Sequence, residues 1–118
     1  MRLSNTGTVF VFSGSEHRWP EKTLGAVREL LTSDSAFCDS MSRCDGALAE
    51  FVDWSLTEVL NGVHGGLDPG RRDVWQPVDF AVMVSLVARW RTLEVAPDAV
   101  IGVSHGEIAA AHVAGALT

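Results

Sequence analysis

The sequence lacks tyrosine, has two cysteines, and contains few basic residues: nine Lys and Arg against fifteen Asp and Glu. A net charge of −6 with dispersed basic residues argues against nucleic acid or an anionic membrane as the main partner. No uninterrupted hydrophobic segment is long enough to span a bilayer. The apolar run Val9–Phe12 is too brief for the core of a signal peptide. These absences predict a cytoplasmic protein that binds neither membrane nor nucleic acid.

The two cysteines also exclude some kinds of site. Cys38 and Cys44 fall six residues apart in one predicted helix, hence roughly 9 Å along its axis. That separation exceeds the span of an undistorted disulfide. No second cysteine pair is present to complete a metal site. We therefore expect two reduced thiols and no metal.

The remaining composition is that of a folded protein. The chain has 118 residues and 47% apolar residues, enough for one domain at most. Hydrophobic patterning predicts an α/β fold, with part of a parallel-sheet, hydrolase-like core and helices on both sides. The expected elements are a strand at 8–12, helices at about 23–31, 34–51, 55–61 and 77–93, a strand at 99–103, a sharp turn at 104, and a helix at 105–117.

Local signals support these elements. The first strand is apolar on both faces, which is typical of a central parallel strand covered from both sides. After a predicted cap at Asp34, an apolar stripe recurs at helical spacing. A capping-box pattern at Ser55 and Glu58 begins the next helix. The stripe consists of Phe37, Met41, Cys44, Leu48 and Phe51.

The second half of the chain begins with a loop. Residues 62–74 are rich in Gly, Pro and charge, and Pro77 stands where a helix can start. That helix is apolar nearly all round and is predicted to be buried. Its Arg89 and Arg91 are expected to reach the surface or to pair with Asp79 or Glu94.

Two strands do not make a stable sheet with this much helix around them. The chain either pairs with something else or belongs to a larger unit.

The strongest chemical signal is the G-x-S-x-G pattern of residues 102–106, between a predicted buried strand and a predicted helix. In such a nucleophile elbow, glycines at both flanks, here Gly102 and Gly106, remove side chains that would collide. The serine, Ser104, then projects into a cleft. The backbone N–H of His105 points at the reacting carbonyl, near the positive end of the helix.

A serine hydroxyl needs a base, and no histidine is well placed to serve as one. His105 is expected to line the cleft wall, and His112 lies two helical turns beyond the serine, where packing is its expected role. His64 falls in the predicted loop. His17 follows the first strand without further support for a catalytic role.

Beyond the pentapeptide, nearly the whole chain resembles the acyltransferase domain of modular type I polyketide synthases. It is also similar to malonyl-CoA:acyl-carrier-protein transacylase. The most specific segment is 98–117 (DAVIGVSHGEIAAAHVAGAL), and the region around Phe37–Trp54 matches the polyketide version well. The resemblance also covers the first strand, Trp19, Gln76-Pro77 and Trp90-Arg91.

The resemblance implies transfer of malonyl or a substituted malonyl group from coenzyme A to an acyl carrier protein. Ser104 would be acylated, with backbone N–H groups of His105 and Ser15 forming the oxyanion hole. Gln76 and His105 would border the substrate pocket. A coenzyme A thioester is then a substrate, with no bound cofactor. The partners are the carrier protein and neighbouring synthase domains.

The chain departs from the family pattern in informative places. Glu16 replaces a glycine of the family's Gly-Gln-Gly-Ser loop, and Val103 replaces the histidine of its GHSxG signature. The family's histidine base and its arginine clamp for the malonyl carboxylate lie downstream of the elbow. Residues 1–118 are therefore expected to be the N-terminal part of one domain, truncated after the elbow helix. We expect the isolated chain to be nearly inert.

Two other functions stay open. The first is a non-catalytic remnant or interaction module of a polyketide synthase, for which the altered loop is the argument. The second is a serine esterase of the α/β-hydrolase type, whose elbow is similar. The 98–117 segment does not follow a hydrolase pattern, which argues against the esterase.

Overall fold

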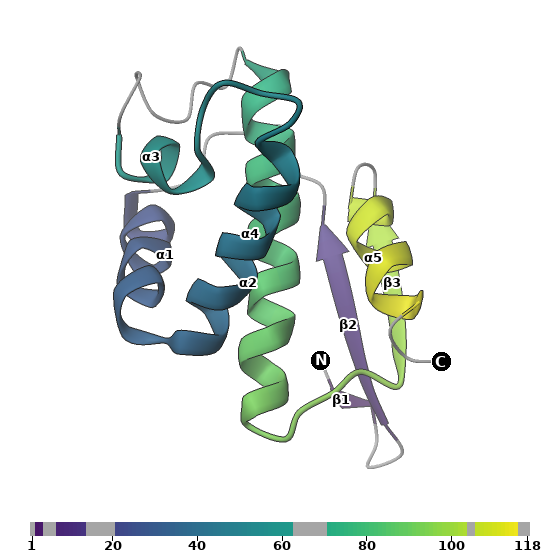
Figure 1. Cartoon of the computed structure of the whole chain (residues 1–118). Coiled ribbons are helices and arrows are strands. Elements are labelled where there is room, and N and C mark those ends of the chain that lie inside the picture. Colours follow the sequence, from purple (N-terminus) through teal and green to yellow (C-terminus); the bar gives the residue numbers. More distant parts are fainter. Residues whose placement is uncertain (1, 4–6, 14–20, 63–70, 104–105, 116–118) are drawn as a thin grey trace.

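The computed structural model describes residues 2–3, 7–13, 21–62, 71–103 and 106–115. A cluster of helices stands beside a small sheet, and the long helix α4 (Arg72–Thr92) runs between the two (Figure 1). The expected α/β arrangement of helices and a parallel strand pair is confirmed at this level. Whether the core is hydrolase-like stays a prediction.

The sheet has three strands in the order β1-β2-β3. The central strand β2 (Gly7–Ser13) pairs in parallel with β3 (Ala99–Val103), as the apolar pattern predicted. On its other side β2 pairs antiparallel with β1 (Arg2–Leu3), which sequence analysis missed because two residues carry no periodicity.

A reciprocal pair of hydrogen bonds fixes where the two parallel strands begin. The backbone N–H of Thr8 donates to the Asp98 carboxylate at 2.7 Å. The backbone N–H of Asp98 donates to the Thr8 carbonyl at 2.8 Å. The strands then run in register from Val9 opposite Ala99 to Ser13 opposite Val103. Both strands therefore end at the same edge of the sheet.

Helices α1 (Glu21–Ser33) and α2 (Ser35–Leu48) follow each other almost without a break. Asp34 separates them and caps α2, since its carboxylate accepts from the Phe37 N–H at 2.8 Å. The same carboxylate lies 3.3 Å from Arg89 of α4. The cap is as predicted, whereas the expected pairing of Arg89 with Asp79 or Glu94 is replaced by this contact.

The end of α2 differs from the prediction. The helix stops at Leu48, and Phe51, assigned to the stripe, lies beyond it with 80% of its surface exposed. Phe37 and Met41 are fully buried as expected. Residues 49–51 form a turn, in which the N–H groups of Phe51 and Val52 both donate to the Leu48 carbonyl, at 2.8 and 3.1 Å.

Helix α3 (Leu56–Leu60) is capped from a distance rather than by a capping box. Ser55 is its N-cap residue but makes no side-chain capping bond. Instead the Asp45 carboxylate, on α2, accepts from the Leu56 N–H at 2.9 Å and from the Ser55 hydroxyl at 2.7 Å. The predicted box is wrong because a tertiary contact supplies the acceptor.

Helix α4 begins at Arg72, five residues before the proline predicted to start it. The loop predicted for residues 62–74 is therefore too long at its end, and Pro77 lies inside the helix. Pro77 has no N–H to donate to the carbonyl of residue 73, so the second turn of the helix lacks one hydrogen bond. Burial compensates, since Val74 and Trp75 are 7% and 9% exposed and extend the apolar face of Val78.

The end of α4 closes with a left-handed residue. Glu94 has φ of 61°, and the N–H groups of Glu94 and Val95 return to the carbonyls of Arg91 and Trp90, each at 3.0 Å. This pairing is the Schellman pattern, in which glycine is usual. The chain then passes through Pro97 into β3.

Two apolar clusters hold the structure together. One joins α1, α2, α3 and α4 around Phe37, Met41, Leu56, Leu60 and Val78. The other packs Phe12 of β2 and Val87 of α4 against α5 (Gly106–Gly115), through Ala109, Ala110 and Val113. Ser40 and Ser85, both buried, share a 2.9 Å hydrogen bond between α2 and α4.

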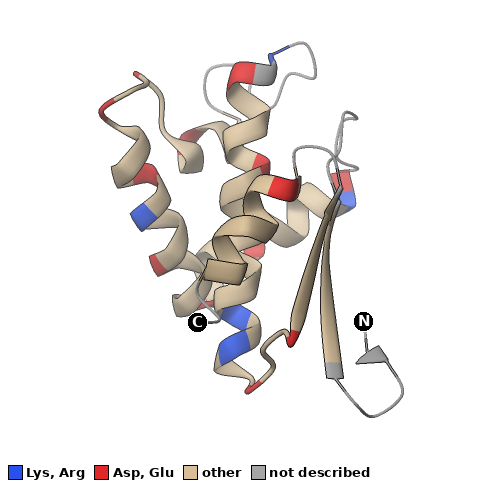
Figure 2. Cartoon of the chain, turned by 90° about the vertical axis from the view of Figure 1, so that its right-hand side faces the viewer, with Lys and Arg blue, Asp and Glu red and all other residues tan. Residues whose placement is uncertain are grey.

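The described helices cover one face of the sheet only. Figure 2 shows the strands standing to one side of all these helices. On the other face Val11 and Ile101, which are register partners, are 50% and 54% exposed. The expected cover on both sides is therefore not supplied by the described residues. Among these residues no helix is long and apolar enough to cross a membrane.

Candidate active site

The end of β3 and the start of α5 lie close together in the sequence and in space. Only residues 104 and 105 separate the end of the strand from the start of the helix. A Cβ atom placed on Gly102 would lie 2.4 Å from the Glu107 Cα and 2.7 Å from the Gly106 carbonyl oxygen. No side chain fits there, so Gly102 lets the helix fold back directly against its own strand.

Gly106, the other flanking glycine, is buried as the first residue of α5. Ser104 and His105, the predicted nucleophile and oxyanion donor, lie outside the described residues. What the structure does fix is the geometry on both sides of them.

The predicted second oxyanion donor, Ser15, also lies outside the described residues. Its segment nevertheless starts at a defined place, because Ser13 and Val103 are register partners at the ends of β2 and β3. The loop that carries Ser15 and the connection that carries Ser104 therefore leave the sheet from adjacent main-chain positions. This is the juxtaposition that an oxyanion hole built from both segments requires.

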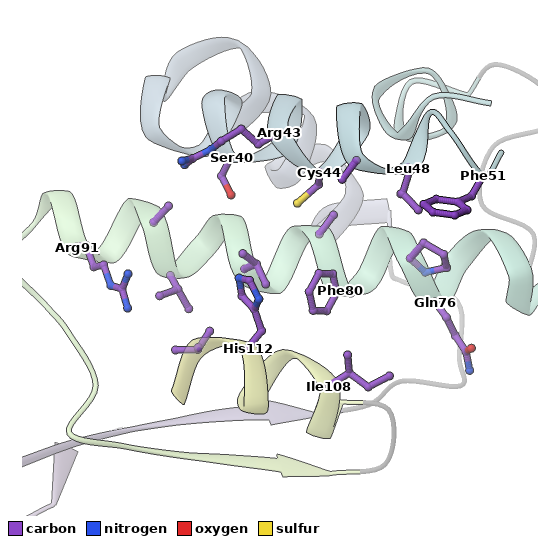
Figure 3. A pocket seen from close by; sticks show the side chains of 17 residues that line it. Ser40, Arg43, Cys44, Leu48, Phe51, Gln76, Phe80, Arg91, Ile108 and His112 are labelled. Atoms are coloured by element: carbon purple, nitrogen blue, oxygen red, sulfur yellow. The ribbon is translucent and has the colours of Figure 1, made fainter. Parts of the chain in front are cut away.

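Gln76 lies on the second turn of α4 and is half-buried. It borders a groove together with Ile108, which is in the first turn of α5 (Figure 3). The predicted pocket residue therefore lies at the end of the groove nearest the turn into α5.

The groove has a volume of about 820 Å³ and runs between α2, α4 and α5. Its wall is mainly apolar, with Phe80 and Val84 on the α4 side. Cys44 of α2 also borders it, and burial raises the pKa of this thiol above its ordinary value of 9.0. Both cysteines are free, as predicted.

Sequence analysis missed the groove. Its signal was present as small and apolar residues at helical spacing on α4, namely Pro77, Ala81, Val84 and Ala88. That spacing is shared by any buried helix, so it did not reveal an open space.

Among the histidines, His112 is described by the structure. Its ring packs edge-on against Phe80, with ring centroids 5.7 Å apart and planes at 73°. The imidazole thus borders the groove, in the packing role predicted for it. His17, His64 and His105 lie outside the described residues. Within those residues, no three His, Cys, Asp or Glu side chains gather as a metal site.

Comparison with known proteins decides the family. The model of the acyl transferase domain matches residues 9–118. The chain belongs to the acyl transferase domain family. This confirms the resemblance inferred from the sequence, and the acyltransferase relatives are domains of polyketide synthases.

Two curated relatives illustrate the likeness. The mycoketide-CoA synthase of Mycobacterium tuberculosis is 55% identical over 111 residues, which are 94% of this chain and 3% of the relative. The erythronolide synthase EryA2 of Saccharopolyspora erythraea is 52% identical over 111 residues, again 3% of its length. This acyltransferase segment therefore spans a small part of the large synthases it matches.

Solved structures agree. The loading acyltransferase of the avermectin modular polyketide synthase superposes with a TM-score of 0.81 at 49% identity, over 92% of this chain and 33% of that one. The acyltransferase domain from module 8 of the salinomycin polyketide synthase gives 0.80 at 51% identity, over 92% and 25%. The acyltransferase fold seen here is thus shared with domains three to four times longer.

Proposed function

We propose that this segment supplies the nucleophile of an acyltransferase that moves malonyl, or a substituted malonyl group, from coenzyme A to an acyl carrier protein during polyketide synthesis. The observation that carries the proposal is the approach of the Gly106 and Glu107 main chain to Gly102, which is so close that no Cβ atom fits at this position. A strand-to-helix turn this close is what a G-x-S-x-G elbow needs to expose its serine.

In the proposed reaction, the Ser104 Oγ attacks the thioester carbonyl carbon of the acyl-CoA and loses its proton to a base. The tetrahedral intermediate collapses by breaking the carbon–sulfur bond, and coenzyme A leaves as its thiol after taking up a proton. The carrier's phosphopantetheine thiol then attacks the acyl-serine ester and regenerates the hydroxyl.

Two features of the chain support stabilisation of the developing oxyanion. The N-terminus of the ten-residue helix α5 contributes partial positive charge next to Ser104. The backbone N–H groups of His105 and Ser15 are the proposed donors, in segments that start side by side. Gln76 borders the approach to the turn and is proposed to contact the substrate.

The base is the missing part. His112 lies eight residues beyond Ser104 in the sequence, and its ring packs on Phe80. We propose that the base and the carboxylate clamp come from the remaining part of an acyltransferase domain. The 118-residue chain alone should then transfer acyl groups about a thousandfold or more slowly than a complete domain.

The test is a chimera in which this chain replaces the matching segment of the salinomycin module 8 acyltransferase. Malonyl-CoA and methylmalonyl-CoA are each added, and coenzyme A release and the mass of the Ser104 peptide are measured. We expect rapid release and an acyl adduct on Ser104, both lost in Ser104→Ala. Ser42→Ala, which changes an exposed serine on α2, should behave as the unchanged chimera does.

The alternatives give different outcomes. A folded chimera that stays unacylated on Ser104 would identify a non-catalytic remnant. Turnover of p-nitrophenyl acetate by the isolated chain, lost in Ser104→Ala, would identify an esterase.

A further inference from the structure

Asp79 is a buried carboxylate on a face of α4 away from the groove, with 6% of its surface exposed. One turn further along α4, Val82 packs with α1, α2 and α3, whereas Met83 packs with the sheet and α5. Asp79 therefore lies on the stripe of α4 between these two apolar clusters. Trp75, one turn earlier on the same stripe, is 9% exposed. Among the described residues, neither Asp79 nor Trp75 belongs to either cluster.

A carboxylate buried this deeply is stable only beside a positive or hydrogen-bonding partner. Five arginines have other contacts or border the groove. They are Arg28 on the Leu60 carbonyl, Arg71 on Asp73, Arg89 on Asp34, and the groove residues Arg43 and Arg91. Lys22 is exposed in the first turn of α1, and Arg2 is a register partner of Thr8, near the start of β2. Of the nine Lys and Arg, this leaves Arg18 and Arg72.

The topology favours Arg18. Strand β2 ends at Ser13 and α1 begins at Glu21, and the two elements lie on opposite sides of α4 (Figure 1). The connection 14–20, which contains Arg18, therefore has to pass from one side of α4 to the other. The stripe of Asp79 is the part of α4 that separates the two sides away from the groove. Arg72, in contrast, begins α4 about 10 Å before Asp79 along the helix axis.

We propose that Asp79 is a positioning residue, whose carboxylate pairs with the Arg18 guanidinium and holds the connection 14–20 against α4. A guanidinium suits this place because it stays charged and can donate two parallel hydrogen bonds to one carboxylate. Ser15, the proposed second oxyanion donor, lies three residues before Arg18. Fixing Arg18 therefore limits the positions open to the Ser15 N–H. This effect on catalysis rests on the proposed function, whereas the pairing does not.

The pairing is tested in the 118-residue chain by urea denaturation. We expect Arg18→Met to raise the equilibrium constant of unfolding about 100-fold or more, because it leaves a buried carboxylate without its cation. The double variant Arg18→Met/Asp79→Leu replaces both charges by apolar groups and should return to within about fivefold of the unchanged chain. Lys22→Met, which removes an exposed cation nearby in the sequence, should stay within about twofold.

The positioning role is tested in the chimera with the salinomycin module 8 acyltransferase, by single-turnover acylation of Ser104 from malonyl-CoA. We expect Arg18→Met to lower the maximal rate constant about tenfold at an unchanged half-saturating concentration, because a misplaced oxyanion donor weakens the transition state alone. Arg18→Lys keeps the charge and should recover part of the rate. Asp45→Ala, which also lowers stability but lies on α2, should acylate as the unchanged chimera does.

Three results would overturn the proposal. The first is that the losses in Arg18→Met and Asp79→Leu add in the double variant. The second is that His17→Gln or Arg72→Gln, and not Arg18→Met, causes the loss that Asp79→Leu suppresses. The third is an unchanged acylation rate in Arg18→Met. If the unchanged chimera is not acylated, the proposed function fails, and the urea measurements still decide whether Arg18 and Asp79 pair.

Discussion

At the scale of single residues, Gly102 carries the strongest constraint in the molecule. Any side chain there meets the backbone of Glu107 and Gly106 rather than a side chain that can move. We expect Gly102→Ala to lower the free energy of unfolding by about 3 kcal/mol or more. Urea denaturation followed by circular dichroism measures the change.

Gly25 provides the matched control, because a Cβ at this position in α1 meets nothing within 4 Å. Gly25→Ala should stabilise the chain by about 0.5–1 kcal/mol through its better helix propensity. Equal stability of Gly102→Ala and the unchanged chain would mean that the turn is not packed as described.

Cys44 makes the stability depend on pH. Burial raises the pKa of its thiol in the folded chain above the value of 9.0 that it keeps when unfolded. The contribution of the protonated Cys44 thiol to stability is therefore fully present below the unfolded-state pKa. It is lost as pH rises through the folded-state pKa, because the thiol of the unfolded chain ionises first. Urea midpoints between about pH 7 and pH 10 should fall more steeply for the unchanged chain than for Cys44→Ala. Cys38→Ala should keep the steep dependence.

At the scale of elements, Asp45 joins α2 to the start of α3. No sequence pattern indicates this contact. Removing its carboxylate leaves the Leu56 N–H and the Ser55 hydroxyl without this acceptor. Asp45→Ala should lower the free energy of unfolding by about 1–2 kcal/mol. Asp39→Ala, an exposed aspartate on the same helix, should change it by less than about 0.5 kcal/mol. Equal losses in the two variants would contradict the capping role.

The elements show how far sequence patterns reach. Helical spacing and the cap at Asp34 predicted α2, because both signals are local. Local signals could not predict the start of α4, because it depends on the burial of Val74 against other parts of the chain. They could not predict the cap of α3 either, because its acceptor is Asp45 on another helix. For the site, the flanking glycines were predictable from a motif, whereas the groove exists only once three helices are packed.

At the scale of the whole molecule, the dominant feature is the sheet face that the described helices leave uncovered. Ile101 points away from the helices, and its neighbour Val100 packs toward α4 and α5. Ile101→Thr should reduce self-association, measured by light scattering, with little change in stability. Val100→Thr should instead cost about 1 kcal/mol or more and leave association unchanged. Reduced association in Val100→Thr alone would contradict this assignment of faces.

The paired hydrogen bonds of Thr8 and Asp98 act at the opposite end of the strands from the proposed catalytic turn. They work as an anchor that sets how far each strand extends before it ends, over five residue pairs of about 3.3 Å each. Shortening the connection before Asp98 by one residue would slide β3 past β2 and exchange its inner and outer faces. Alignment of the end that carries the proposed catalytic turn is thus decided about 15 Å away, by the carboxylate of Asp98.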